Sequence, residues 1–421
     1  MTEERTIQVR SEIDPLRRVL VHRPDKGTAR ISPKQAEDLL FDDIVYLPRM
    51  QEEHDIFVEV LKAFLGDGNV MEMEQLLCEA LGQDEEAKQE MLDMIVQDEE
   101  LPSTVKTMLE SLSDEALTQV LITGYYEQED YFLFHPIPNF IFTRDIAFVV
   151  NDHLVITKAA KEARSRENFL TRFIIWAHPI FQQLQKEDKI INMNKVDLFP
   201  PSKKGEPVSL EGGDAMLLHP DFLLIGASER TTPHAIRSLA RALFAKGVVK
   251  NVVQVNIPND RSFMHLDTIF TQINEKDFVC YKPIVYDGMS SNLIVFNHTG
   301  AEKTYLSVKD FIRSEICTDP RFLFSGHGES PYQEREQWTD GCNLVALRPG
   351  VAITYDRNPR TERSFKDAGY RVVHAYDLLK AFKDGIILPQ EVKNTIITLP
   401  SSELSRARGG SHCMTCPIER G

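Results

Sequence analysis

Four pairs of short β-prone runs constrain the fold more than any other feature of this sequence. Within each pair, turn-forming Asn, Asp, Pro or Gly separates two runs rich in Val, Ile, Leu or Phe. The runs cover residues 146–150 and 154–157, 215–218 and 222–225, 268–273 and 278–281, and 344–347 and 351–354. This arrangement predicts antiparallel hairpins.

Two of the hairpins lead into a helical pattern and then another strand. Residues 235–246 are expected to form a helix before a strand at 252–255, and residues 361–368 a helix before a strand at 371–374. Residues 18–22 resemble a first, incomplete copy. Recurring ββαβ units predict a closed radial array of blades, although a generic α/β domain with several hairpins fits the same pattern.

One long stretch has no strand signal. Residues 73–121 carry an acidic amphipathic pattern that Pro102 and short polar joints divide into several helices. The expected organisation is a propeller formed by residues 1–72 and 126–421, with an all-helical insertion at 73–125.

Composition narrows the class of function. The net charge of −16 argues against a general nucleic-acid or membrane-surface partner, since both are anionic. The N-terminal residues Met1 to Thr6 are polar, and no apolar run approaches the ~20 residues that span a bilayer. Six cysteines are too few for a disulfide scaffold, which favours a reducing cytoplasm.

Five short segments combine ionisable groups with turn residues. They are residues 142–145, 211–214, 265–268, 338–341 and 408–417. Each lies at the edge of one expected blade, and loops at one end of a radial array converge on its axis. The segments are therefore expected to form a single site.

Each segment also has a structural interpretation. An Asp after a strand is commonly a turn or helix cap. Glu211-Gly-Gly-Asp214 fits a tight turn whose glycines supply positive φ. His265 and Asp267 would share one face of a strand, as a ligand pair, a catalytic pair or two satisfied polar groups.

The last segment contains Cys413-Met-Thr-Cys416, which has redox or half-zinc-site spacing. No second such pair exists, and Pro417 follows directly. A nucleophilic Cys413 makes better use of its surroundings, because Arg408, His412 and the flexible Gly409-Gly410 would favour the thiolate.

The acidic residues then indicate the substrate. Carboxylates beside a thiolate are unfavourable unless the substrate is itself a cation. A planar guanidinium suits bidentate carboxylates. Asp145, Glu211 and Asp267 would bind a guanidinium, Cys413 would attack its carbon and His265 would transfer protons.

Six segments in this order resemble arginine deiminases of the guanidine-modifying superfamily. They lie at residues 11–24, 40–44 with 53–55, 139–145, 210–214, 264–268 and 408–417, so the resemblance covers nearly the whole chain. It implies a five-bladed pseudo-symmetric α/β propeller with a helical insertion.

The resemblance also implies roles for individual residues. Cys413 would be the nucleophile of a covalent amidino-thioether intermediate, with His265 as general acid and base, Glu211 supporting it, and Asp145 and Asp267 on the guanidinium. The amino-acid end of L-arginine would be recognised by Asn139, Phe142, Arg164, Arg230 and Arg408. No metal or organic cofactor is implied, Cys416 would be a bystander, and a homo-oligomer is allowed.

Two features depart from the family pattern. Ala407 stands where the family usually has glycine, and residues 377–391 form a longer link before the last strand. Three rivals therefore stay open: hydrolysis of agmatine or methylarginine, amidinotransfer, and a non-catalytic arginine-binding regulator.

Overall fold

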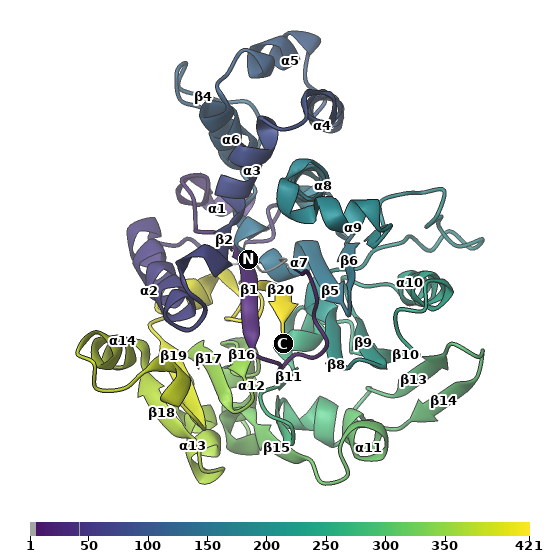
Figure 1. Cartoon of the computed structure of the whole chain (residues 1–421), viewed down its shortest axis with the longest axis vertical. Helices are drawn as coiled ribbons and strands as arrows, with labels where there is room; N and C mark the ends of the chain where they lie inside the picture. The colour runs from purple at the N-terminus through teal and green to yellow at the C-terminus, as the bar shows by residue number, and fades with distance from the viewer. Residues whose placement is uncertain (1–5, 42) are drawn as a thin grey trace, which may run out of the picture.

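The computed structural model describes residues 6–41 and 43–421. The first five residues, which bear on export, and Asp42 of the 40–44 motif lie outside this part. The chain has a mixed α/β fold in which several small sheets surround a common centre (Figure 1). In the described part, five of the sheets share one pattern: an antiparallel pair, then a parallel strand.

Two of these sheets lie between residues 147 and 305. One sheet contains β5 (Ala147–Val150), β6 (His153–Ile156) and β7 (Ile190–Asn192), with α8 (Ser165–Ala177) and α9 (Gln182–Lys186) between β6 and β7. The next contains β8 (Ala215–His219), β9 (Phe222–Ala227), β10 (Asn251–Asn256), β13 (Leu293–Asn297) and β14 (Glu302–Tyr305), with α10 (Pro233–Ala245) before β10.

Two further sheets follow. The third contains β11 (Phe270–Gln272), β12 (Asp277–Cys280) and β15 (Arg321–Phe324), with α11 (Val308–Phe311) before β15. The fourth contains β16 (Val345–Arg348), β17 (Val351–Tyr355), β18 (Arg371–His374) and β19 (Thr395–Leu399). Its helices are α13 (Pro359–Asp367) and α14 (Ala375–Lys383), and α12 (Tyr332–Trp338) precedes β16.

The fifth sheet joins the two ends of the chain. The C-terminal β20 (Cys416–Arg420) pairs antiparallel with β1 (Leu16–Val21), and β1 pairs parallel with β2 (Val70–Glu72). Helices α1 (Pro33–Ala36) and α2 (Leu47–Leu65) lie between β1 and β2. The copy that was incomplete at the N-terminus is thus completed by the last strand of the chain.

Strands β5, β6, β17 and β19 are buried on both faces, which explains their nearly continuous apolar runs. Along β5, Phe148 and Val150 face one core cluster, while Val149 faces another. Along β6, Val155 joins the first of these clusters and Leu154 the second. Successive side chains of a strand point to opposite faces, so the side chains of this one hairpin are divided between two cores.

All four predicted hairpins are confirmed. The third begins later than expected, because residues 266–268 form a 3-10 turn before β11. The longer link at 377–391 contains most of α14, which packs on α2.

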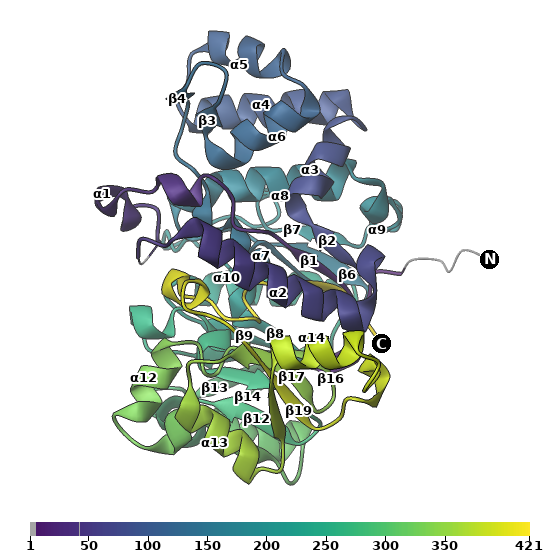
Figure 2. The ribbon, with the colours of Figure 1, turned by 90° about the vertical axis from the view of Figure 1, so that its left-hand side faces the viewer.

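Four helices lie between β2 and the short hairpin of β3 (Tyr125–Tyr126) and β4 (Tyr131–Phe132). They are α3 (Met73–Leu81), α4 (Glu85–Asp98), α5 (Ser103–Glu110) and α6 (Asp114–Thr123), and they lie above α8 in Figure 2. Their apolar side chains Leu77, Leu92 and Leu117 share one buried cluster with Leu170 and Phe173 of α8.

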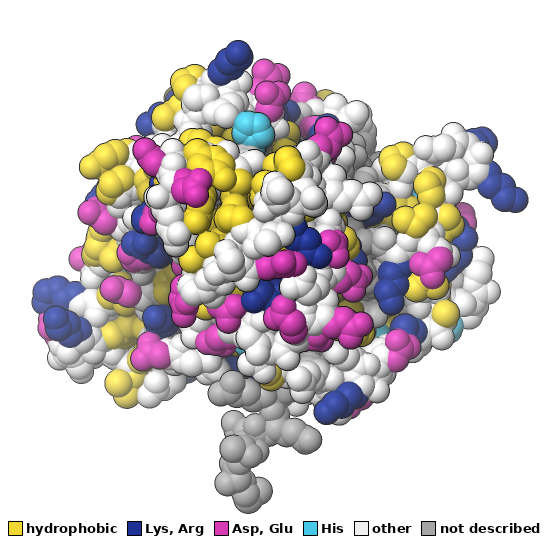
Figure 3. Space-filling view, turned by 90° about the horizontal axis from the view of Figure 1, so that it is seen from above, with side chains coloured by type: hydrophobic (Ala, Val, Ile, Leu, Met, Phe, Trp, Pro, Cys, Tyr) yellow, Lys and Arg dark blue, Asp and Glu magenta, His cyan; other side chains and the backbone are white. Residues whose placement is uncertain are grey.

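The outer face of this helical region mixes acidic and basic side chains, with hydrophobic side chains gathered in one area (Figure 3). No continuous basic patch is seen on this face, in keeping with the net charge of −16. None of the described helices combines the length and apolar character that a bilayer crossing requires.

Candidate active site

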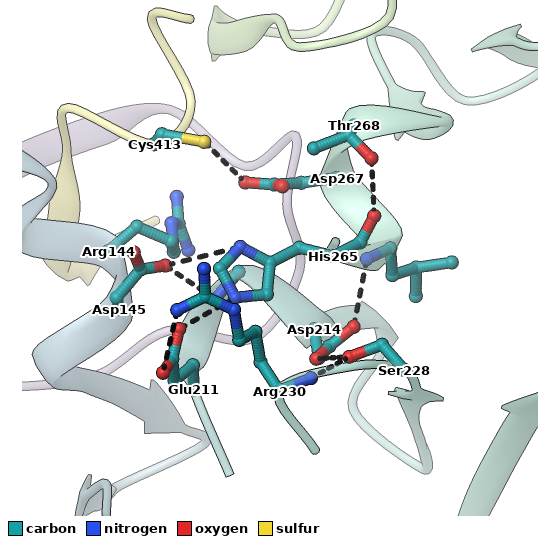
Figure 4. Close-up of polar contacts among 12 residues, drawn as sticks. Arg144, Asp145, Glu211, Asp214, Ser228, Arg230, His265, Asp267, Thr268 and Cys413 are labelled. Atoms are coloured by element: carbon teal, nitrogen blue, oxygen red, sulfur yellow. Dashed lines mark hydrogen bonds and ion pairs between the residues drawn. The ribbon is translucent and has the colours of Figure 1, made fainter. Parts of the chain in front are cut away.

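The five residues predicted to be catalytic occupy equivalent places in four of the five sheets: each lies just before the first strand. Asp145 belongs to α7 (Thr143–Ile146) and precedes β5, and Glu211 precedes β8. His265 and Asp267 precede β11, and Cys413 precedes β20. Because the first strands begin around one centre, segments distant in the sequence meet there (Figure 4).

Nine of the ten predicted site residues line one small cavity. They are Asn139, Phe142, Asp145, Arg164, Glu211, Arg230, His265, Arg408 and Cys413. The wall also includes Leu40, Met264, Thr268 and Ala407. The free volume is only about 30 Å³, room for a water or two, so a larger ligand requires side chains of the wall to move.

Cys413 is buried, and its thiol has two polar neighbours. Sγ lies 3.2 Å from Oδ2 of Asp267, and the amide Nδ2 of Asn343 lies 3.0 Å from Sγ. Burial and the negative charges of Asp267 and Asp145 raise the pKa of the Cys413 thiol well above its ordinary value. The expectation that its surroundings favour the thiolate is therefore wrong for the protein without ligand.

The loop around Cys413 explains this difference. The backbone N–H groups of His412 and Cys413 donate to Oδ1 of Asn343, at 3.0 and 3.1 Å. The His412 ring contacts Asp267 and Glu12. A Cβ on Gly410 would lie 2.7 Å from Oδ1 of Asn343, so this glycine is needed for close approach.

His265 is held by two carboxylates. Its Nε2 lies 2.9 Å from Oε2 of Glu211, and its Nδ1 lies 3.7 Å from Oδ1 of Asp145. Burial favours the neutral imidazole, but the charge of Asp145 and the hydrogen bond to Glu211 outweigh it and raise the pKa of His265 to about 10. His265 is thus a cation at neutral pH and can donate a proton.

The Glu211-Gly-Gly-Asp214 segment differs from the expected turn. Gly212 and Gly213 belong to a 3-10 helix and are not among the residues with positive φ. A Cβ on Gly213 would lie 2.7 Å from Nδ1 of His265 and 2.9 Å from Oδ1 of Asp145. The glycine lets both catalytic candidates approach this loop, and its N–H donates to Asp145 at 3.2 Å.

Asp267 lies behind Cys413 and is not part of the cavity wall. His265 is the residue before a 3-10 turn that contains Asp267, so the two do not share one face of a strand. Although burial opposes ionisation, the hydrogen bond and charge of His412 lower the pKa of Asp267. Its other oxygen, Oδ1, is buried without a hydrogen-bond partner among the described residues.

Arg164 is already bound by acidic side chains. Its Nη1 lies 2.7 Å from Oδ2 of Asp145 and 3.3 Å from Oε2 of Glu211, and its Nη2 lies 2.7 Å from Glu167. Its guanidinium also donates to the carbonyl of Asn139, at 3.3 Å. Binding a substrate carboxylate with Arg164 would require some of these contacts to change.

Arg230 is held more loosely. Its closest acidic contacts, to Glu211 and Glu229, are both 3.8 Å long. Arg230 is 3% exposed, and its buried Nε has no hydrogen-bond partner among the described residues. A buried cation of this kind is costly unless an anion joins it, so Arg230 is placed to receive an anionic ligand group.

Arg408 and its neighbours close the wall on another side. Its guanidinium stacks on the ring of Trp338, 3.4 Å from the ring centre. Arg408 itself takes the left-handed conformation (φ 60°), whereas Ala407 is not among the residues with positive φ. The alanine therefore introduces no backbone strain at the position where the resemblance expects glycine.

One further reading of the cluster is a cation site. Ligand atoms of Asp145, Glu211 and His265 lie within 4.8 Å of one another. The Arg164 guanidinium is bonded to both of these carboxylates. The negative charge of the cluster is thus already balanced by side chains.

Cys416, the other half of the Cys-x-x-Cys pair, has a different environment. Its thiol lies 3.2 Å from the carbonyl of Ala147, and burial raises its pKa to about 12. All six cysteines are free.

Sequence reasoning missed several residues of the site. Asn343 binds the Cys413 thiol and backbone, but an isolated Asn in Gly-Cys-Asn gives no local signal. Glu12 is likewise brought in only by a tertiary contact, whereas Glu167 pairs locally with Arg164, three positions before it.

Comparison with known proteins places this chain in a family. A model of the arginine deiminase family matches residues 37–126 and 103–420. The chain is 33% identical to the arginine deiminase of Listeria monocytogenes serotype 4b (strain CLIP80459), covering 100% of this chain and 99% of that protein. The sequence identity is 34% to the arginine deiminase of Listeria welshimeri, with 99% of both chains covered. It is 33% to the arginine deiminase of Bacillus cereus (strain ATCC 10987), with 98% of both chains covered. The chain belongs to the arginine deiminase family.

A solved structure supports the fold independently. The N-terminal domain of ArgZ, a cyanobacterial arginine dihydrolase bound to its product, superposes with a TM-score of 0.50 at 15% identity. The match covers 97% of this chain and 98% of that domain. At this identity the likeness concerns the fold alone.

Proposed function

We propose that this protein is an arginine deiminase, which hydrolyses L-arginine to L-citrulline and ammonia through a covalent bond to Cys413. The observation that carries the proposal is the cavity where the Cys413 thiol, the His265–Glu211 pair and the Asp145 carboxylate meet. Membership of the arginine deiminase family supports the same activity.

The substrate would bind through both of its ends. The guanidinium would lie between Asp145 and Asp267, where the unpaired Oδ1 of Asp267 offers an acceptor for its N–H groups. The α-carboxylate would bind Arg230, with Arg164 and Arg408 as further cations and with Asn139 and Phe142 on the same wall. Because the free cavity is small, we expect arginine to displace wall side chains as it enters.

The positive charge of the substrate would also make the Cys413 thiol easier to deprotonate. A cation beside Cys413 offsets the carboxylates that raise the thiol pKa. The thiol proton would leave Sγ through water in the cavity, while Asp267 stays the anion that binds the guanidinium. The thiolate then adds to the guanidinium carbon.

Two displacement steps complete the reaction. His265, a cation in the free protein, protonates the departing nitrogen, and ammonia leaves a thiouronium on Cys413. Water then loses a proton to the neutral His265 and adds to the same carbon. The C–S bond breaks, the proton of the new hydroxyl passes to the departing sulfur, and citrulline is released.

The direct test is product analysis. The protein is incubated with L-arginine, and citrulline and ammonia are quantified. Equimolar release supports the proposal, and an absence of both products from folded protein contradicts it.

The same assay separates the rival functions. An agmatine or methylarginine hydrolase would act on those guanidines in preference to arginine, and an amidinotransferase would release ornithine when an amine acceptor is present. A non-catalytic regulator would bind arginine and leave it unchanged.

The finer architecture belongs to the same proposal. The five sheets with the shared strand pattern would be the blades of a pseudo-symmetric α/β propeller. Residues 1–72 and 126–421 would form this catalytic unit, and residues 73–125 the helical insertion. A homo-oligomer and a cytoplasmic location stay predictions, and the required partner is the small-molecule substrate.

A further inference from the structure

A buried chain of side chains runs behind the nucleophile. Nδ1 of His412 lies 2.9 Å from Oδ2 of Asp267, and Nε2 of His412 lies 3.1 Å from Oε2 of Glu12. Glu12 precedes β1, His412 precedes β20 and Asp267 precedes β11, so three distant segments meet here. All three side chains are buried, and neither Glu12 nor His412 lines the cavity.

The protons of the His412 ring follow from its neighbours. His412 lowers the pKa of Asp267, although burial opposes this. At Glu12, burial is outweighed by the charge of Arg144 and the hydrogen bond of His412, and the pKa falls to about 2. Both carboxylates are thus anions at neutral pH. A neutral imidazole has a single N–H and would direct a lone pair at one of them, so the ring donates at both nitrogens.

The contact between His412 and Asp267 determines which carboxylate oxygen of Asp267 stays available to a ligand. Oδ2 receives the His412 N–H and also faces the Cys413 thiol. Oδ1 is left without a partner among the described residues. His412 therefore fixes the rotation of the carboxylate and keeps one oxygen unpaired for another donor.

We propose that His412, held in place by Glu12, is a positioning residue that presents Asp267 to the substrate as an oriented anion. This inference rests on the proposed function, since it gives Asp267 a guanidinium to bind. His412 acts through Asp267: within the described part of the chain, its ring nitrogens hydrogen-bond Asp267 and Glu12 and not the sulfur of Cys413.

The other charged groups near the chain are consistent with this role. Arg144 lies 3.9 Å from Oε2 of Glu12, and its Nε is 3.5 Å from the carbonyl of His412. Arg420 acts on Glu12 as a second positive charge. The second oxygen of Glu12 accepts from the backbone N–H of Leu217 at 3.4 Å. Positive and negative groups thus alternate from Arg144 through Glu12 and His412 to Asp267.

The test is His412→Gln, read from the pH dependence of kcat/KM for L-arginine. Without the imidazolium, Asp267 loses its charge partner and binds a proton more readily. We expect the acid limb of kcat/KM to move up by about one pH unit or more, so that at pH values on the limb itself kcat/KM falls about tenfold. Glu12→Gln, which keeps an oxygen acceptor for the ring, should shift the limb in the same direction but less.

His22→Gln is the matched control. His22 is also buried between two carboxylates, at 2.9 Å from Glu72 and 3.2 Å from Asp25, but contacts neither Asp267 nor Cys413. Its loss should lower stability and leave the acid limb in place. If His22→Gln moves the limb as far as His412→Gln, the effect is a general consequence of losing a buried ion pair and the proposal is wrong.

A second measurement does not depend on turnover. The side-chain carboxyl carbon of Asp267, labelled with 13C and assigned by its loss in Asp267→Asn, reports its protonation directly. The proposal predicts a higher titration midpoint in His412→Gln, and in Glu12→Gln should His412→Gln fail to fold. An unchanged midpoint overturns the proposal, whereas a parent protein that makes no citrulline overturns the proposed function.

Discussion

The Cys413 thiol lies 3.2 Å from Oδ2 of Asp267, so the nucleophile touches one of the carboxylates proposed to bind the substrate. In the free protein this contact keeps the thiol protonated, because the anions beside it raise its pKa. A guanidinium that binds Asp267 would reverse the balance of charge. The nucleophile is therefore expected to become reactive when its own substrate arrives.

This predicts slow alkylation of the free protein by a neutral reagent. At pH 8, iodoacetamide should modify Cys413 at least about tenfold more slowly than an unperturbed thiol, since the rate follows the thiolate fraction. Asp267→Asn should increase that rate while it lowers turnover. Mass spectrometry of the Cys413 peptide gives the rate, with partly exposed Cys317 as the internal reference. Rapid modification of Cys413 in the parent would contradict this account.

Arg230→Gln should weaken recognition of the amino-acid end. Among the described residues Arg230 has no acidic contact closer than 3.8 Å, so its main expected partner is the substrate carboxylate. We expect KM for L-arginine to rise at least about tenfold, since a charged hydrogen bond contributes about 1.5–3 kcal/mol. Agmatine lacks the carboxylate, so its KM should change much less. An equal loss for both substrates would show that Arg230 acts elsewhere.

Asn343→Ala should lower kcat more than it raises KM. The change removes the amide that donates to Sγ and leaves the N–H groups of His412 and Cys413 without their acceptor. A lost buried partner costs about 1–3 kcal/mol, so a lower thermal midpoint is also expected. Asn256→Ala, which removes an asparagine pair on β10 away from the cavity, is the control. A normal kcat in Asn343→Ala would exclude the proposed positioning of the sulfur.

The raised pKa of His265 predicts a pH-dependent contribution to stability. Its folded pKa is about 10, above the ordinary 6.5, so the folded state binds the proton more tightly. The stabilisation is complete below about pH 6.5 and is lost as pH rises towards 10. The stability advantage of the parent over His265→Gln should therefore shrink across this window in denaturant titrations. An advantage that grows with pH would contradict the assignment.

The sequence predicted the helices and strands that have a clear apolar pattern bounded by turn-forming residues. Val149 and Leu154 flank a turn at Asn151 and Asp152, and the hairpin of β5 and β6 forms there. Helix α14 was missed because its apolar stripe is short. The helix packs on α2, and that tertiary contact cannot be inferred from the local sequence. Strand β14 is polar and exposed, and lies at the edge of its sheet, paired with β13.

In the site, too, residues in an informative local segment could be predicted, whereas contacts between distant segments could not. Residues 408–417 could be identified as chemically important because they combine cysteine, histidine and arginine with glycines. The direction in which His412 faces could not be predicted, since Glu12 lies 400 positions away in the chain. The protonated state of Cys413 likewise depends on Asp267 and Asp145, which other sheets supply.

The most direct test of the central claim is the mass of the protein after rapid acid quenching with L-arginine. The account predicts a transient adduct of arginine less ammonia on the Cys413 peptide, with no adduct and no citrulline from Cys413→Ser. Citrulline formation by the parent without such an adduct, together with an active Cys413→Ser, would contradict covalent catalysis by Cys413.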